Sequence, residues 1–446
     1  MFKNKYLNLL FILLFIVAGY VITASVYPKN LNRYPGFVLL LLVDLYLWSY
    51  VKKRVFTYKK WPRFTIGLIY WLPIMMLSGL AVIAYFIPYE NWNHSLRIYL
   101  FGLVFAFYTA KIITAIILLA SDIFKVFFRL FSLISNKKTK NQQVDSKTKI
   151  SRGRFIENVA YVSGGLILGT MFVGMFRWVH DFRLHTINLQ LSRLSSDFQG
   201  FKIVQISDLH LGSWTNENQL QQAVDLINEQ NPDLVVFTGD LVNYKTEEAN
   251  KFKDILAQIN SKNGCAAILG NHDYGDYVSW PTKQAKKRNL EDLFQFYRDL
   301  NWTLLRNGNF TIEQNGERLG IIGVENWSAN SRFPQYGNIT KATKGLGKVS
   351  AKILLSHDPS HWSQKVLIEH PDIDLMLAGH THGFQFGIEI PGIKWSPAKY
   401  MYQHWAGLYT DIEKDQHLYV NRGLGSIGYP GRIGILPEIT VITLKA

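Results

Sequence analysis

Long apolar runs in the first 178 residues are the feature that most constrains how this chain folds. A helix that crosses a bilayer core about 30 Å thick needs about 20 mainly apolar residues. Five segments meet or approach that length, namely residues 7–27, 36–51, 64–88, 98–120 and 161–178. The second is short and the fifth is rich in glycine, but tilting and local bilayer thinning accommodate such mismatch. We therefore predict an all-α transmembrane bundle at the N-terminus.

The charge of the chain is distributed unevenly. The formal net charge is +15, and the excess of Lys and Arg lies between the apolar runs, whereas the rest of the chain is close to neutral. A nucleic-acid-binding protein needs a basic patch on a folded domain. We therefore expect no nucleic-acid partner. The excess of Lys and Arg between the apolar runs indicates membrane topology, so the expected partner is the lipid bilayer.

The basic residues also indicate orientation. Lys3 and Lys5 precede the first run, and clusters at 52–63 and 125–154 follow the second and fourth. Because cytoplasmic loops carry the excess of Lys and Arg, we expect a multi-pass protein of the cell inner (cytoplasmic) membrane with a cytoplasmic N-terminus. The fifth run then carries the following domain outward. If that run lies on the membrane instead of crossing it, the domain is cytoplasmic.

These patterns predict four parts of the chain. A four-helix transmembrane region covers residues 1–135, and a charged cytoplasmic linker covers 136–154. The fifth transmembrane segment covers 155–180, and a catalytic domain covers 181–446. Residues 121–134, which alternate apolar residues with Lys125 and Arg129, predict an interfacial continuation of the fourth helix.

Two charges fall inside the apolar runs, Asp44 in the second and Lys111 in the fourth. A charge inside a bilayer is costly unless it is paired or faces a polar cavity. An ion pair that holds the bundle together is the favoured interpretation. A path for protons or for a substrate is the alternative.

From residue 186 onward, short β-rich runs alternate with helical ones, which is typical of an α/β domain. The apolar runs at 201–206, 234–238, 266–269, 353–355 and 375–378 predict strands. The stretches at 217–229, 247–259 and 283–300 predict helices. Each predicted strand runs into a polar cluster, and ligands of open α/β sheets collect beyond the carboxyl ends of strands.

The polar clusters form a set of short motifs. In order they are Asp208-Leu-His210, Gly239-Asp240, Gly270-Asn271-His272-Asp273, Ser356-His357-Asp358 and Gly379-His380-Thr-His382. Singly, each has an ordinary interpretation as a turn, a loop start or a surface histidine. Their occurrence together, each at the end of a predicted strand, indicates one functional site.

The donor atoms in these motifs are oxygens and imidazole nitrogens without a thiolate, a set that suits Mn²⁺, Fe or Zn²⁺. The single cysteine, Cys265, excludes a cysteine-rich zinc site. Two divalent ions close together can activate a hydroxide at neutral pH and neutralise a phosphoryl group. We therefore predict two divalent metal ions as cofactors, with Mn²⁺ favoured over Fe and Zn²⁺.

The five motifs resemble those of the calcineurin-like metallophosphoesterase superfamily. Within it they are most similar to the bacterial membrane-associated branch related to UDP-2,3-diacylglucosamine pyrophosphatases and to transmembrane proteins with a metallophosphoesterase domain. The resemblance covers residues 186–444. It implies a β-sandwich of two mixed sheets flanked by helices, so the expected fold is an all-α transmembrane bundle followed by an α/β domain of this kind.

The resemblance also implies roles for single residues. Asp208, His210 and His382 would bind one metal, and Asn271, His357 and His380 the second, with Asp240 bridging. His272 would be the catalytic residue that stabilises the phosphate or protonates the leaving oxygen. Asp273 would orient His272 without binding metal. Close relatives often have a second glycine where this chain has Phe384. Because Phe384 is not a predicted ligand, this departure bears on the choice of substrate and not on the expected chemistry.

Other side chains allow two interpretations each. Arg332, Arg422 and Arg432 are either structural or hold a second phosphate. The aromatic segment 395–409 is either a loop packed on the domain or a lip that meets the membrane or a lipid-linked substrate.

The predicted function is that of a membrane-anchored, metal-dependent phosphoesterase. A two-metal-activated hydroxide would hydrolyse a phosphodiester, pyrophosphate or phosphomonoester bond, with a membrane lipid or lipid-linked nucleotide as the expected substrate. One alternative is a tethered generic nucleotide phosphodiesterase. Another is a membrane transporter or sensor with an accessory phosphoesterase domain.

Overall fold

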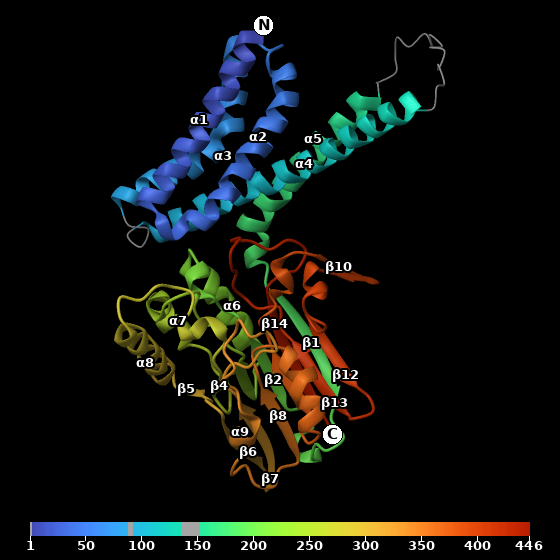
Figure 1. Ribbon diagram of the computed structural model, residues 1–446. Coiled ribbons are helices and arrows are strands. Elements are labelled where there is room, and N and C mark those ends of the chain that lie inside the picture. The colour runs from blue at the N-terminus through green and yellow to red at the C-terminus, as the bar shows by residue number, and fades with distance from the viewer. Residues whose placement is uncertain (1, 88–91, 135–151) are drawn as a thin grey trace. The chain divides into compact units, whose positions relative to one another are not determined.

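The computed structural model describes residues 2–87, 92–134 and 152–446 (Figure 1). Contacts within the chain define two compact units, Met1–Phe172 and Val173–Ala446. Most of the predicted linker, residues 136–151, lies outside the described residues, as does Pro88 at the end of the third predicted span. Residues 152–154 of that linker already belong to a helix.

The first unit is helical. Its described helices are α1 (Phe2–Val26), α2 (Tyr34–Val55), α3 (Lys60–Phe86), α4 (His94–Ile134) and α5 (Arg152–Phe176), the last of which crosses into the second unit. Among the described residues, these five are long and apolar enough to cross a membrane. Each of the five predicted spans falls on one of them. The predicted interfacial stretch, residues 121–134, is the last part of α4, which runs without a break for 41 residues. In this stretch the side chains of Phe124, Phe127, Phe128 and Phe131 are exposed.

The predicted ion pair inside the bundle is confirmed. Lys111 Nζ lies 2.6 Å from Asp44 Oδ1 and donates a second hydrogen bond of 2.7 Å to the Tyr70 carbonyl oxygen. The other carboxylate oxygen of Asp44 accepts a 2.7 Å hydrogen bond from the Tyr108 hydroxyl. Because both buried charges are paired and hydrogen-bonded, they tie α2, α3 and α4 together at a tolerable cost.

The second unit contains two six-stranded sheets. The first has the order β1-β14-β2-β3-β4-β5, with strands Arg183–Gln190, Glu438–Lys445, Lys202–Ile206, Leu234–Phe237, Cys265–Ala267 and Trp302–Leu304. The second has the order β12-β13-β9-β8-β7-β6, with strands Gly407–Asp411, Gln416–Val420, Leu375–Ala378, Ala351–Leu355, Glu317–Gly323 and Gly308–Gln314. In each sheet four neighbouring strands run parallel, β2 to β5 and β13 to β7, so their carboxyl ends lie at one edge.

The two sheets pack face to face. Alternate residues of a strand point to opposite sides of its sheet, so each sheet has one face toward the other sheet and one face away from it. Ile203 and Val236 of the first sheet share one core cluster with Ile353 and Leu377 of the second. The intervening residues of the first sheet, such as Val235, pack instead against its covering helices. A third cluster covers the outer face of the second sheet. The α/β prediction with a β-sandwich of two mixed sheets is confirmed.

The helices of the second unit are short apart from two. They are α6 (Glu217–Glu229), α7 (Lys253–Leu256), α8 (Lys283–Asp299), α9 (Ile339–Ala342) and α10 (Leu367–Glu369). The helix expected over 247–259 is instead a 3₁₀ turn, Thr246–Phe252, followed by α7. The Glu248 carboxylate accepts hydrogen bonds from the backbone N–H groups of residues 243–245, a capping arrangement that fixes where the 3₁₀ turn begins.

Candidate metal centre

The predicted site residues follow the carboxyl ends of parallel strands in both sheets. Asp208 and His210 follow β2, Asp240 follows β3, and Asn271 and His272 follow β4. In the second sheet, His357 follows β8, and His380 and His382 follow β9. The edge at which parallel strands end is where ligand sites of α/β sheets form.

Several of these residues have an unusual backbone. The φ angles of Asp208, His210, Asp240, His380 and His382 lie between 43° and 72°, in the left-handed region. Residues other than glycine adopt this region at an energetic cost, and such strain gathers at functional sites. The strands therefore end in turns that direct these side chains toward one another.

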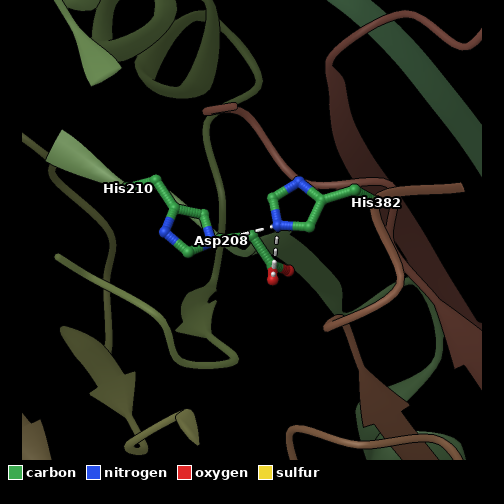
Figure 2. Close-up of side chains that lie close together, drawn as sticks. All are labelled: Asp208, His210 and His382. Carbon is green, nitrogen blue, oxygen red and sulfur yellow. Dashed lines mark hydrogen bonds and ion pairs between the residues drawn. The ribbon is translucent and has the colours of Figure 1, made fainter. Parts of the chain in front are cut away.

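Asp208, His210 and His382 form the first group (Figure 2). Their potential ligand atoms all lie within 4.8 Å of one another, and all three side chains are buried. His210 Nε2 lies 3.0 Å from His382 Nε2, which in turn lies 3.3 Å from Asp208 Oδ1. Two imidazole nitrogens and a carboxylate oxygen thus converge on one point, as in a metal site.

Asp240, His357 and His380 form a second group whose ligand atoms also lie within 4.8 Å of one another. His357 Nε2 is 3.1 Å from Asp240 Oδ2 and 3.2 Å from His380 Nδ1. Asp240 Oδ2 is also 3.6 Å from His210 Nε2 in the first group. One carboxylate oxygen therefore faces both groups.

Asn271 lies beside the second group. Its side-chain amide donates a 2.7 Å hydrogen bond to the Tyr277 hydroxyl. Within the described part of the chain, its buried Oδ1 has no hydrogen-bond partner. A buried oxygen without a hydrogen-bond partner is costly, and a cation would satisfy it.

Hydrogen bonds fix which ring nitrogen of the histidines faces the centre. His357 Nδ1 is 2.7 Å from the Thr238 carbonyl oxygen, so Nδ1 donates a hydrogen bond to it and Nε2 points to Asp240. His380 Nε2 is 3.0 Å from the Tyr402 hydroxyl, which leaves Nδ1 toward His357. Metal-binding histidines are commonly oriented in this way by a partner on the far nitrogen.

His272 is half-buried and packs against the first group with its ring 4.9 Å from that of His210. Its backbone N–H donates a 2.8 Å hydrogen bond to Asp240 Oδ1, and its Nδ1 lies 2.8 Å from the Asn243 carbonyl oxygen. Nδ1 therefore donates a hydrogen bond to that carbonyl oxygen. Nε2 is the nitrogen left for a substrate.

The expectation that Asp273 orients His272 is wrong. The Asp273 carboxylate accepts hydrogen bonds from the backbone N–H groups of Asp240 (3.0 Å), Leu241 (2.8 Å) and Gly270 (2.8 Å). It thus clamps the turn after β3 onto the turn after β4, while the Asn243 carbonyl orients His272. Burial and the nearby Asp240 carboxylate raise the pKa of Asp273 to about 7.

The electrostatics of the centre favour positive charge. Burial would raise the pKa of Asp208, but His382 and His357 outweigh it and hold that pKa below its ordinary range. The pKa of Asp240 is lowered in the same way, against burial, by His357 and His272. Burial lowers the pKa of His357, but Asp240 and Asp208 outweigh it and raise the pKa to about 10. Burial lowers the pKa values of His210 and His380, so both rings are neutral at pH 7.

The donor set fits divalent metal ions. Each of the two groups offers one carboxylate and two imidazole rings, and among the described residues the buried Asn271 oxygen has no hydrogen-bond partner. A borderline metal such as Mn²⁺, Fe or Zn²⁺ takes this mixture of oxygen and nitrogen ligands. All seven predicted ligands and His272 are brought together. Their assignment as ligands and catalytic residue remains a prediction.

Sequence reasoning missed two tyrosines that line the centre. The Tyr277 ring packs against that of His272 in a tilted arrangement, 4.2 Å between ring centroids, and its hydroxyl accepts a hydrogen bond from Asn271. Tyr402 contacts His380. Neither lies in a motif. The only sequence signal for Tyr277 is its position six residues after Asn271. Single aromatic residues are too common for this spacing to indicate a functional role.

Two of the arginines considered as phosphate ligands have structural roles. Arg422 is buried and pairs with Glu438 and, at 2.5 Å, with Glu389. Arg432 is buried and donates to the carbonyl oxygens of residues 422, 423 and 425. Arg332 is exposed.

Two parts of the chain match known protein families. Residues 201–384 match the family described as "Calcineurin-like phosphoesterase", and residues 32–178 match "Probable Calcineurin-like phosphoesterase, transmembrane domain". A transmembrane protein with metallophosphoesterase domain from Danio rerio is 27% identical over 91% of this chain and 87% of its own length. The uncharacterized metallophosphoesterase YkuE of Bacillus subtilis is 31% identical over 67% of this chain and 99% of its own length.

A third relative has a named activity. The UDP-2,3-diacylglucosamine pyrophosphatase LpxG of Chlamydia trachomatis is 30% identical over 54% of this chain and 83% of its own length. The chain belongs to the calcineurin-like phosphoesterase family. It is a membrane protein with several spans and a hydrolase that acts on phosphoester bonds.

Proposed function

We propose that the centre binds two divalent metal ions. Asp208, His210 and His382 would hold one ion, and Asn271, His357 and His380 the other, with Asp240 shared. The observation that carries this proposal is the position of Asp240 Oδ2, which faces His357 at 3.1 Å and His210 at 3.6 Å. Mn²⁺ is the favoured metal, with Fe and Zn²⁺ as the alternatives.

Bound ions would lower the pKa of a water molecule and neutralise charge on the phosphoryl oxygens. The protein groups supply the rest. Because its Nδ1 proton is held by the Asn243 carbonyl, His272 would present Nε2 to the substrate and act there as the group that protonates the leaving oxygen. Asp273 keeps the two turns that carry Asp240 and His272 at a fixed separation.

The substrate that we propose is a lipid or lipid-linked nucleotide with a phosphodiester or pyrophosphate bond. This proposal draws on the membrane spans of the chain and on its likeness to LpxG, whose name specifies UDP-2,3-diacylglucosamine. The domain from residue 181 onward would lie on the extracytoplasmic side of the inner membrane, as the distribution of Lys and Arg predicts.

The test uses the purified full-length chain in detergent, stripped of metal with a chelator. We expect added Mn²⁺ to restore hydrolysis of bis-p-nitrophenyl phosphate, and Asp240→Asn to abolish it. Asp225→Asn, in an exposed aspartate on α6, is the matched control and should retain full activity. Absence of turnover with Mn²⁺, Fe²⁺ and Zn²⁺ alike would refute the proposal.

Two further measurements separate the alternatives. Cleavage of UDP-2,3-diacylglucosamine in vesicles at a rate well above that of soluble nucleotide diesters would favour the lipid substrate over a generic nucleotide phosphodiesterase. For orientation, Ile412→Cys places a thiol on the exposed turn between β12 and β13. Labelling by an impermeant maleimide in intact cells is expected, and protection until lysis would place the domain in the cytoplasm.

A further inference from the structure

The two-stranded hairpin β10–β11 (Ile388–Ile390 and Ile393–Trp395) has its apolar face turned outward. Its antiparallel register pairs Ile388 with Trp395, Glu389 with Lys394, and Ile390 with Ile393. Since neighbouring residues point to opposite faces, the isoleucines share one face and the charged pair occupies the other. The isoleucines 388, 390 and 393 are 48%, 56% and 53% exposed.

The charged face is tied to the domain, so the orientation of the hairpin is fixed. Glu389 accepts two hydrogen bonds from the Arg422 guanidinium, of 3.0 and 2.5 Å. Lys394 Nζ donates a 2.5 Å hydrogen bond to the Ala406 carbonyl oxygen and lies 5.0 Å from the centre of the Trp405 ring. In a water-soluble sheet the apolar face packs inward and the polar face meets water. Here the arrangement is reversed, as in strands that face lipid.

Other exposed apolar side chains lie close to the hairpin along the chain. Phe384 and Phe386 precede it, and Tyr400 and Met401 follow it; all four are well exposed. Phe384 has a φ of 59°, a conformation that a bulky side chain adopts only at a cost. We call these four residues and the three isoleucines the apolar lip.

The base of the lip is hydrogen-bonded to the last turn of α5, one of the helices that are long and apolar enough to cross a membrane. Val173–Phe176, the last turn of α5, belongs to the second unit, and the Gly174 carbonyl accepts a 3.2 Å hydrogen bond from the Arg432 N–H. The next residue, Ile433, forms a β-bridge with Phe386 and accepts a 2.8 Å hydrogen bond from the Gly387 N–H. One short loop therefore contacts both the last turn of α5 and the residues that lead into the hairpin.

The lip is also next to the metal centre. Phe384 is two residues from His382, and Tyr402, which directly follows the lip residue Met401, contacts His380 at 3.0 Å. The lip is therefore connected to residues of the candidate metal centre at both ends of its segment.

We propose that the apolar lip is embedded in the membrane leaflet that borders the catalytic domain, at the boundary between headgroups and acyl chains. Isoleucine, phenylalanine, tyrosine and methionine on a fixed surface favour that boundary. The hydrogen bond between Arg432 and Gly174 supports this position, because it ties the lip to the last turn of α5, where that helix would reach the bilayer surface. This inference goes beyond the proposed function, because it concerns a surface and holds whatever phosphate bond is cleaved.

The experiment measures the depth of single residues in the bilayer. Because the only cysteine, Cys265, is buried, a cysteine at position 390 can be labelled selectively with an environment-sensitive fluorophore. The full-length Ile390→Cys chain is placed in nanodiscs of phosphatidylethanolamine and phosphatidylglycerol in equal parts, with and without spin-labelled lipid. The matched control is Ile412→Cys, an isoleucine that is 88% exposed on the far turn β12–β13.

We expect spin-labelled lipid to quench the label at position 390 at least about threefold more than the label at position 412. Met401→Cys, on a different segment of the lip, should behave as Ile390→Cys does, which guards against a local folding defect. Equal, weak quenching at positions 390, 401 and 412 would overturn the inference, because the lip would then face water or another protein. Fluorescence requires no turnover, so failure of the proposed reaction leaves this test intact.

Discussion

Replacement of Asp240 by asparagine tests the electrostatics on which the metal centre depends. The substitution keeps the shape of the side chain and removes one negative charge 3.1 Å from His357 Nε2. Two unit charges at that distance interact by about 5 kcal/mol at an effective dielectric constant of 20. That energy corresponds to a pKa change of about 4.

The consequence falls on His357. Its pKa is raised to about 10 by Asp240 and, less strongly, by Asp208. Without the Asp240 charge we expect that pKa to return to its ordinary value or lower, because burial then dominates. In the metal-free full-length chain labelled with ¹⁵N-histidine, His357 should be doubly protonated at pH 8 in the wild type and neutral in Asp240→Asn, as read from its ring nitrogens by NMR.

The same variant should lose function. Loss of a group that only supports a metal ligand typically costs about 10- to 100-fold in activity. Loss of a ligand shared by both metals should cost more, so kcat/KM for bis-p-nitrophenyl phosphate should fall by more than about 100-fold. Asp225→Asn removes a carboxylate of the same type from an exposed helix and should change neither the NMR titration nor the activity. An Asp240→Asn protein in which His357 still titrates near pH 10 would refute the reasoning.

Three further predictions concern other residues. His272→Gln should lower kcat by about 10² to 10⁴ with metal content unchanged in elemental analysis, and an equal loss of metal would assign His272 to the ligands instead. In detergent unfolding experiments, Lys111→Met should destabilise the bundle by about 3 to 5 kcal/mol, because it leaves the buried Asp44 charge unpaired. The double variant with Asp44→Leu should recover most of that loss, and no recovery would contradict a purely structural role for the pair. The imidazolium of His357 should stabilise the metal-free fold fully below pH 6.5, and this stabilisation should disappear as the pH rises to about 10. Calorimetry should therefore show Mn²⁺ affinity rising with pH over this range, and a flat profile would exclude His357 as a ligand.

The sequence predicted the central elements of the fold because they repeat a clear pattern. Helix α6 (Glu217–Glu229) and strand β9 (Leu375–Ala378) match the predicted ranges residue for residue. The outer strands were not predicted, because pairing between distant segments leaves no local signal. Strand β1 pairs with β14 at the opposite end of the domain sequence, Arg183 beside Glu438.

For the candidate site, the sequence predicted which residues gather but not how they are supported. Residues at the carboxyl ends of parallel strands share an edge of their sheet, so gathering within each sheet follows from the pattern. Asp208 and His357 come from different sheets, and they meet because the two sheets pack face to face. The role of Asp273 was missed, since a motif does not tell which backbone N–H groups a carboxylate will meet. The β10–β11 hairpin escaped notice because its strands have three residues each, too few for periodicity to show.

Anomalous diffraction at the manganese absorption edge, from crystals of the full-length chain loaded with Mn²⁺, tests the central claim most directly. We predict two peaks about 3.5 to 4 Å apart, one among Asp208, His210 and His382 and the other among Asn271, His357 and His380, with Asp240 in contact with both. A single peak, or two peaks that Asp240 does not join, would contradict the two-metal centre proposed for this chain.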